Sequence, residues 1–186
     1  MRILGISGSL RSGSLNTRLL RYAAEQAPPG VEITVWDGLR AIPPYDQDQD
    51  GELAPEPVTR LRDAIAQADG LLIATPEYNA SIPGALKNAI DWASRPRAET
   101  PLQGKPAAVI GATTGSFGAV WAQAELRKVL STTGARVVDL DLPVAKGEAA
   151  FDERGALRDE GLRARLREIL AGLTAEIART RELAVR

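Results

Sequence analysis

A loop of glycine and serine near the N-terminus has the composition of a phosphate-binding site. The stretch runs from Gly5 to Thr17, between a short apolar run and a helical pattern that begins at Leu15. A strand, a small-residue loop and a helix N-terminus gather backbone N–H groups around one point, where the helix dipole favours an anion. Arg11 adds a guanidinium group that can hold two phosphate oxygens. The alternative is a turn whose serine hydroxyls only cap the following helix.

The spacing of this loop excludes two common nucleotide motifs. A nucleoside triphosphate loop needs a lysine after its last glycine, and the first lysine of this chain is Lys87. The dinucleotide fingerprint is Gly-x-Gly-x-x-Gly, whereas the glycines here are Gly5, Gly8 and Gly13. A loop that is rich in hydroxyls and free of lysine fits a single phosphate monoester, such as that of FMN.

A second polar loop begins with Pro76-Glu77-Tyr78-Asn79, directly after a buried apolar run. It leads into a helix that Ser81 is placed to cap and that has Pro83 in its first turn. The aromatic ring and the amide of this loop suit contact with a flat heterocycle. The alternative is a stiff turn with an exposed tyrosine.

A third loop, Thr113-Thr114-Gly115-Ser116-Phe117-Gly118, also lies between an apolar run and a helical pattern. Its small residues allow several N–H groups to converge on a carbonyl or an anion. Phe117 either covers part of a bound ring or belongs to the core.

The three loops belong to an alternation of short apolar runs with longer helical patterns. Runs such as Leu71-Leu72-Ile73 are typical of strands that are covered on both faces, as in a parallel sheet. The predicted strands are Arg2–Ser7, Val31–Trp36, Gly70–Thr75, Ala107–Ala112 and Arg136–Leu142. The predicted helices are Leu15–Ala27, Pro57–Ala68, Pro83–Ser94, Gly118–Thr133 and Asp159–Arg181.

This alternation predicts an α/β fold, a doubly wound parallel sheet of five strands in the order 2-1-3-4-5 with helices on both faces. Ligands of such sheets bind beyond the carboxyl ends of the strands, where the strand order reverses. The three loops follow the first, third and fourth predicted strands, so we expect them to meet at that edge.

Composition and charge narrow the class of protein. With 186 residues and 44% hydrophobic residues, the chain is expected to form one domain over residues 1–186. The net charge of −1 gives no basic field for nucleic acid or an anionic membrane. No apolar run reaches the roughly 20 residues of a membrane span, and the first residues lack a secretory signal pattern. We therefore expect a cytoplasmic enzyme without a nucleic-acid or membrane partner.

The chain contains no cysteine and no histidine. This excludes thiolate nucleophiles and the Ser-His-Asp triad, and it removes the commonest metal ligand. A chain so poor in reactive groups can still be an enzyme when a cofactor carries out the difficult step. The segment from Asp46 to Gly51 resembles the start of a calcium loop, but Pro57 stands where a bidentate glutamate is required. We therefore expect a cofactor and no metal site.

Two motifs give the chain a resemblance to a known family. The first is Gly8-Ser9-Leu10-Arg11 with Ser14-x-Asn16, and the second is Pro76-Glu77-Tyr78-Asn79-x-Ser81-x-Pro83-Gly84-x-Leu86-Lys87-Asn88-x-x-Asp91-Trp92. On these motifs the chain resembles the NADPH-dependent FMN reductases, a flavodoxin-like family that includes quinone and chromate reductases. The resemblance is weakest in residues 40–57 and 143–158.

The resemblance implies an FMN site made by all three loops. The residues implied for the phosphate are Ser9, Arg11, Ser14, Asn16 and Thr17. Those implied for the isoalloxazine ring, mainly through backbone groups, are Pro76, Glu77, Tyr78, Asn79 and Ser81. Those implied to complete the pocket are Thr114, Gly115, Ser116, Phe117 and Gly118. The resemblance also implies homodimers or homotetramers in which a partner subunit borders each flavin, with the helix that carries Asn88, Asp91 and Trp92 as the expected interface.

The implied activity is that of an FMN-dependent NAD(P)H oxidoreductase. Hydride passes from NADPH or NADH to bound FMN, and two electrons then pass to a quinone, a free flavin or a similar small acceptor. This transfer depends on alignment and needs no side-chain acid or base, so no catalytic residue is assigned. Two alternatives stay open: a flavodoxin-type electron carrier without NAD(P)H reductase activity, and a flavin-free domain that senses a phosphorylated metabolite.

Overall fold

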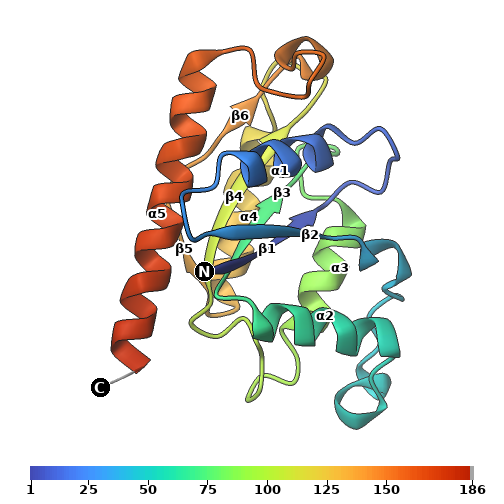
Figure 1. The fold of residues 1–186 in the computed structure, drawn as a ribbon. Helices are drawn as coiled ribbons and strands as arrows, with labels where there is room; N and C mark the ends of the chain where they lie inside the picture. The colour runs from blue at the N-terminus through green and yellow to red at the C-terminus, as the bar shows by residue number, and fades with distance from the viewer. Residues whose placement is uncertain (185–186) are drawn as a thin grey trace.

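The computed structural model describes residues 1–184 and shows a parallel sheet between two layers of helices (Figure 1). The strands lie in the order β2-β1-β3-β4-β5, which confirms the predicted order. The strands are β1 (Arg2–Ser7), β2 (Glu32–Trp36), β3 (Gly70–Ala74), β4 (Pro106–Ala112), β5 (Arg136–Val137) and β6 (Pro143–Val144). The α-helices are α1 (Leu15–Glu25), α2 (Glu56–Gln67), α3 (Gly84–Ala93), α4 (Val120–Thr132) and α5 (Glu160–Ala184).

Strand β1 lies at the point where the strand order reverses. It pairs in parallel with β2 on one side and with β3 on the other, so that Ile3 is opposite both Ile33 and Gly70. The ends of β1 and β3 stay in register, with Ser7 opposite Ala74. The loops that follow these two strands therefore start side by side.

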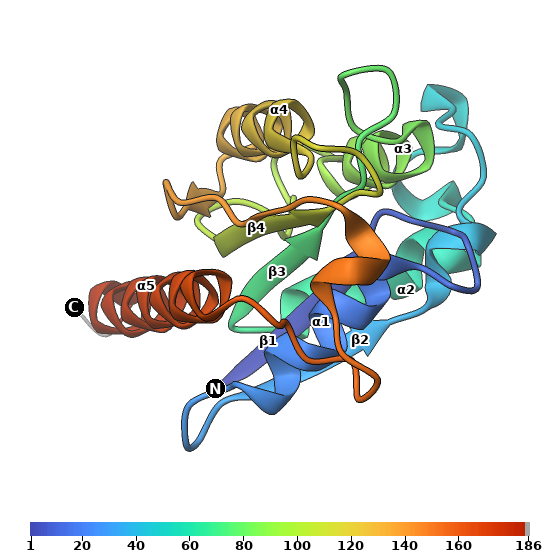
Figure 2. The same ribbon diagram turned by 90° about the horizontal axis from the view of Figure 1, so that it is seen from above.

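Alternating side chains of the strands face two separate cores. Leu72 and Ala74 of β3 face the core under α1 and α5, whereas Leu71 and Ile73 face the core under α2, α3 and α4. Figure 2 shows α1 and α5 on one side of the sheet, with α3 and α4 on the other. Burial on both faces explains why these strands are continuous apolar runs.

The predicted fifth strand, Arg136–Leu142, is instead two short strands with an irregular segment between them. Strand β5 pairs with the start of β4, and β6, which begins at Pro143, pairs with its end. Gln123 of α4, which is fully buried, contacts the end of the irregular segment. Its amide accepts a hydrogen bond from Leu142 N at 2.9 Å and donates to Leu142 O at 3.2 Å. Leu142 O also accepts a hydrogen bond from Gly111 N of β4 at 3.2 Å, so Leu142 is shared between the strand and the side chain.

The segment between β2 and α2 contains short 3₁₀ helices, η1 (Gly38–Ala41), η2 (Gln47–Gln49) and η3 (Gly51–Leu53). Its acidic residues take part in local bonds: Asp46 accepts from Asp48 N, and Asp50 accepts from Gly51 N and from Arg62. Within the residues that the structure describes, there is no cluster of three or more acidic side chains arranged to hold a metal ion. Across residues 1–184, no helix is both long and apolar enough to cross a membrane.

Candidate cofactor site

The loop after β1 is held by a network of hydroxyl groups. Ser14 is the N-cap of α1, and its hydroxyl accepts a hydrogen bond from Thr17 N at 3.1 Å. Thr17 Oγ1 in turn donates to Ser7 Oγ at 3.0 Å, and Ser9 N donates to the same oxygen at 3.4 Å. Ser7 therefore organises the loop, although it was not among the predicted site residues. Its position as the last residue of β1 is the signal that points to it.

The open end of this loop presents donors. The N–H groups of Gly13, Leu15 and Asn16 have no acceptor among the residues that the structure describes. Arg11 is exposed and donates to Gly13 O at 2.8 Å, so its guanidinium group lies over the loop. Arg40, from η1, donates to Leu10 O and brings a second guanidinium group that the sequence did not indicate. Free N–H groups at a helix N-terminus beside two cations fit the chemistry of a phosphate.

Asn16 is committed to the protein through its side chain. It is 2% exposed, and its amide both donates to Ala112 O and accepts from Ala112 N, each at 2.9 Å. This pair of bonds ties the start of α1 to the end of β4. Any contact between Asn16 and a phosphate is therefore left to its backbone N–H.

The loop after β3 turns sharply at Asn79 and Ala80. Tyr78 and Ser81 exchange backbone hydrogen bonds of 3.0 and 3.1 Å, and both central residues have positive φ angles, 54° and 59°. This is the geometry of a type I′ turn. The expectation that Ser81 caps α3 is wrong, because the N-cap is Pro83 and has no side-chain hydrogen bond. Ser81 instead closes the turn that leaves Tyr78 exposed.

Glu77, the neighbour of Tyr78, reaches the first turn of α4, directly after the loop that follows β4. Its Oε2 accepts hydrogen bonds from Trp121 N and Ala122 N, both at 3.0 Å. In that loop Phe117 is 63% exposed and its ring centroid lies 5.0 Å from that of Trp121. Phe117 is therefore at the rim of the site and not in the core.

A cavity of about 150 Å³ joins the three loops. The predicted site residues that line it are Ser9, Arg11, Asn16, Pro76, Glu77, Tyr78 and Thr114. Leu15, Ala112 and Thr113 also line it and were not predicted. The other predicted residues do not line it and lie in the same loops or, for Thr17, in the first turn of α1: Ser14, Thr17, Asn79, Ser81, Gly115, Ser116, Phe117 and Gly118. Arg11, the start of α1 and the exposed Tyr78 all border this cavity, as expected for a ligand that has an anionic tail and a planar head.

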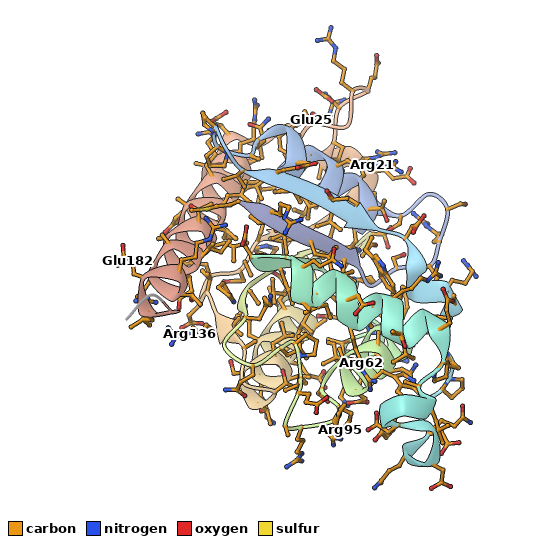
Figure 3. The ribbon with its side chains drawn as sticks, turned by 60° about the horizontal axis from the view of Figure 1, so that its bottom comes forward. Arg21, Glu25, Arg62, Arg95, Arg136 and Glu182 are labelled. Carbon is orange, nitrogen blue, oxygen red and sulfur yellow. The ribbon has the colours of Figure 1, made fainter. Side chains whose placement is uncertain are left out.

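A larger hollow of about 500 Å³ lies at the opposite edge of the sheet. It is lined by Lys87, Arg95 and Lys128 among others, and Arg95 can be located in Figure 3. The C-terminal ends of α3 and α4 border it, so it offers no helix N-terminus to an anion, although Arg97 adds a further cation to its lining. The smaller cavity lies at the N-terminus of α1 and at the carboxyl edge of the sheet, which makes it the better match to a phosphorylated cofactor.

Two residues of the expected interface helix are used within the chain. Trp92 is fully buried, and its Nε1 donates to Pro43 O at 2.9 Å. Asn88 also donates to Pro43 O and accepts from Tyr45 N, each at 2.8 Å. These side chains hold the segment after η1 against α3.

Comparison with known proteins gives consistent findings. Residues 1–149 match the family described as NADPH-dependent FMN reductase. The chain is 43% identical, over 182 residues and 97% of both chains, to an NAD(P)H-dependent FMN reductase of Pseudomonas aeruginosa. It is 38% identical, over 164 residues and 88% of both chains, to a 2-hydroxy-1,4-benzoquinone reductase of a Burkholderia species. A solved flavoenzyme NAD(P)H:(acceptor) oxidoreductase of Paracoccus denitrificans superposes with a TM-score of 0.84 at 36% identity, covering 96% of this chain and 98% of that one.

Proposed function

Because the chain belongs to the NADPH-dependent FMN reductase family, we propose that its FMN lies along the carboxyl edge of the sheet, with the phosphate at the loop after β1. The protein is an FMN-dependent NAD(P)H oxidoreductase that reduces quinones, free flavin or similar acceptors. When bound, FMN supplies two-electron redox chemistry between a nicotinamide and the acceptor. The observation that carries the placement is the cavity shared by the loops after β1, β3 and β4.

The loop after β1 would hold the phosphate by charge and by hydrogen bonds. Arg11 would contribute its guanidinium group, and Ser9, Ser14 and Thr17 their hydroxyls. Asn16 would act through its backbone N–H, because its amide is already bonded to β4. The helix dipole of α1 adds a favourable field at the same point.

The loops after β3 and β4 would hold the flavin ring. Pro76, Glu77 and Tyr78 would lie along the ring, mainly through backbone groups, with Asn79 and Ser81 fixing the turn behind them. Thr114 to Gly118 would complete the pocket on the other side. Their part in the reaction is to orient the ring and the nicotinamide, which is the main requirement of hydride transfer.

We also propose that the protein is a cytoplasmic homodimer or homotetramer in which a partner subunit borders each flavin. The exposed aromatic residues near the site support the oligomeric state: Tyr78 is 53% exposed, Phe117 63% and Trp121 48%. Such a group of large apolar side chains is characteristic of an interaction surface. Size-exclusion chromatography with light scattering and cell fractionation test the two parts of this proposal.

The placement of FMN is tested with the variant R11A. A charged hydrogen bond contributes about 1.5–3 kcal/mol, so the Kd for FMN should rise about tenfold or more. The measurement is a titration of the apoprotein with FMN, together with the visible spectrum of the purified protein and its bleaching by NADPH without oxygen. R21A, an exposed arginine on α1, is the matched control. An unchanged Kd for R11A would refute the phosphate assignment.

A further inference from the structure

Helix α4 begins without a cap of its own. Its N-cap residue, Ala119, has a φ angle of 62° and no side-chain hydrogen bond to the helix. Gly118 before it also has a positive φ, and a Cβ atom there would lie 2.4 Å from the Pro143 carbonyl carbon. This segment is therefore confined against β6 and has no polar side chain for the first N–H groups of the helix, which need acceptors from elsewhere.

Glu77 supplies that acceptor from a different loop. A single oxygen of its carboxylate receives the N–H groups of both Trp121 and Ala122 at 3.0 Å, across 44 and 45 residues of sequence. A carboxylate at a helix N-terminus is also favoured by the helix dipole. The loop after β3 is thereby joined through one side chain to the first turn of α4, which follows directly on the loop after β4.

The contact between Glu77 and α4 borders the proposed flavin site. Glu77 itself lines the cavity, between Pro76 and Tyr78, and Thr114 lines it from the loop after β4. The buried amide of Asn16 already fixes the loop after β1 to the end of β4. Glu77 adds a second such link, between the loop after β3 and the start of α4, where the loop after β4 ends.

We propose that Glu77 is a positioning residue, whose carboxylate sets the spacing of the two ring-binding loops and so the orientation of the bound flavin ring. This inference rests on the proposed function, because it assigns the two loops to the ring. It differs from a purely structural role, in which Glu77 would stabilise α4 and leave the bound flavin as it is.

Three variants at one position separate these roles. E77A removes the acceptor, E77D keeps the charge but shortens the reach by one methylene, and E77Q keeps an acceptor oxygen at the original reach. E125A, on the same helix, is the matched control, since the side chain of Glu125 forms no hydrogen bond or ion pair with the residues that the structure describes. The readouts are the Kd for FMN, the visible circular dichroism of the complex at saturating FMN, and the melting temperature of the apoprotein.

We expect E77A and E77D to raise the Kd for FMN about tenfold and to change the visible circular dichroism of the saturated complex. E77Q should restore the wild-type spectrum with a Kd within about threefold, and E125A should match wild type. A wild-type spectrum for saturated E77A and E77D would overturn the inference, even with a lowered melting temperature. Failure of all three variants to fold would also overturn it, because Glu77 would then be structural. Absence of FMN binding by the wild-type protein would instead refute the proposed function.

Discussion

Replacing Asn16 with alanine should lower the free energy of unfolding of the apoprotein by about 2–4 kcal/mol. The variant leaves a buried donor and a buried acceptor of Ala112 without the partners that now lie 2.9 Å away. Each unpaired group costs about 1–3 kcal/mol, or about 2–6 kcal/mol for both. Water can enter from the adjoining cavity and partly replace the amide, so we expect the lower half of that range.

Urea unfolding of the apoprotein measures this effect without interference from a cofactor. With a denaturant slope of about 2 kcal/mol per molar, the midpoint should fall by about 1–2 M. N16D keeps an acceptor for Ala112 N but sets a carboxylate against Ala112 O, so it should be destabilised to a similar extent. R21A, exposed on the same helix, should change the free energy by less than about 0.5 kcal/mol. A loss below about 1 kcal/mol for N16A would refute the role assigned to the amide.

Two further predictions concern a strained turn and a terminal ion pair. A80G should raise the free energy of unfolding by about 0.5–1 kcal/mol, because relief of the 59° φ angle exceeds the entropic cost of glycine. The control A124G, inside α4, should lower the free energy of unfolding by about 1 kcal/mol. If urea titrations show that both variants are less stable than wild type, the reasoning is contradicted. Burial raises the pKa of Asp69, but hydrogen bonds from Arg181 and Arg2 N outweigh it and lower the pKa below its ordinary 3.8. The resulting stabilisation is present above pH 3.8 and is lost as the pH falls through the lowered pKa. In D69N, the urea midpoint should therefore decrease less than in wild type as the pH is lowered. An equal decrease in the two proteins would show that Asp69 is not responsible.

Much of the fold was predictable because each strand and helix carries its own local pattern. Strand β3 is a continuous apolar run, and the strand order follows from the alternation of strands with helices. The fifth strand was the exception. Its pattern through Val137 and Leu142 is typical of a strand, but only the two ends pair with β4, and Leu142 also bonds the side chain of Gln123, 19 residues away. The residue pattern around Leu142 does not predict a contact with a side chain so far away in the sequence.

The sequence predicted which loops form the candidate site, but not which hydrogen bonds their side chains make. Small residues before a helix identify the loop after β1, and Pro76 to Asn79 identify the loop after β3. However, Asn16 bonds a residue 96 positions away, and Glu77 bonds residues 44 and 45 positions away. Amide and carboxylate groups can hydrogen-bond to a ligand or to the backbone. The sequence alone therefore does not predict which partner each of these side chains has.

The divided outer strand should make intermolecular strand pairing at this edge of the sheet unfavourable. An uninterrupted edge strand offers a template on which another molecule can add a strand of its own. Here β5 and β6 have only two residues each, and the segment between them turns the side chain of Asp139, 99% exposed, toward solvent. Incoming chains therefore meet short ladders and a negative charge, which should keep this side of the sheet free of intermolecular β-pairing at high protein concentration.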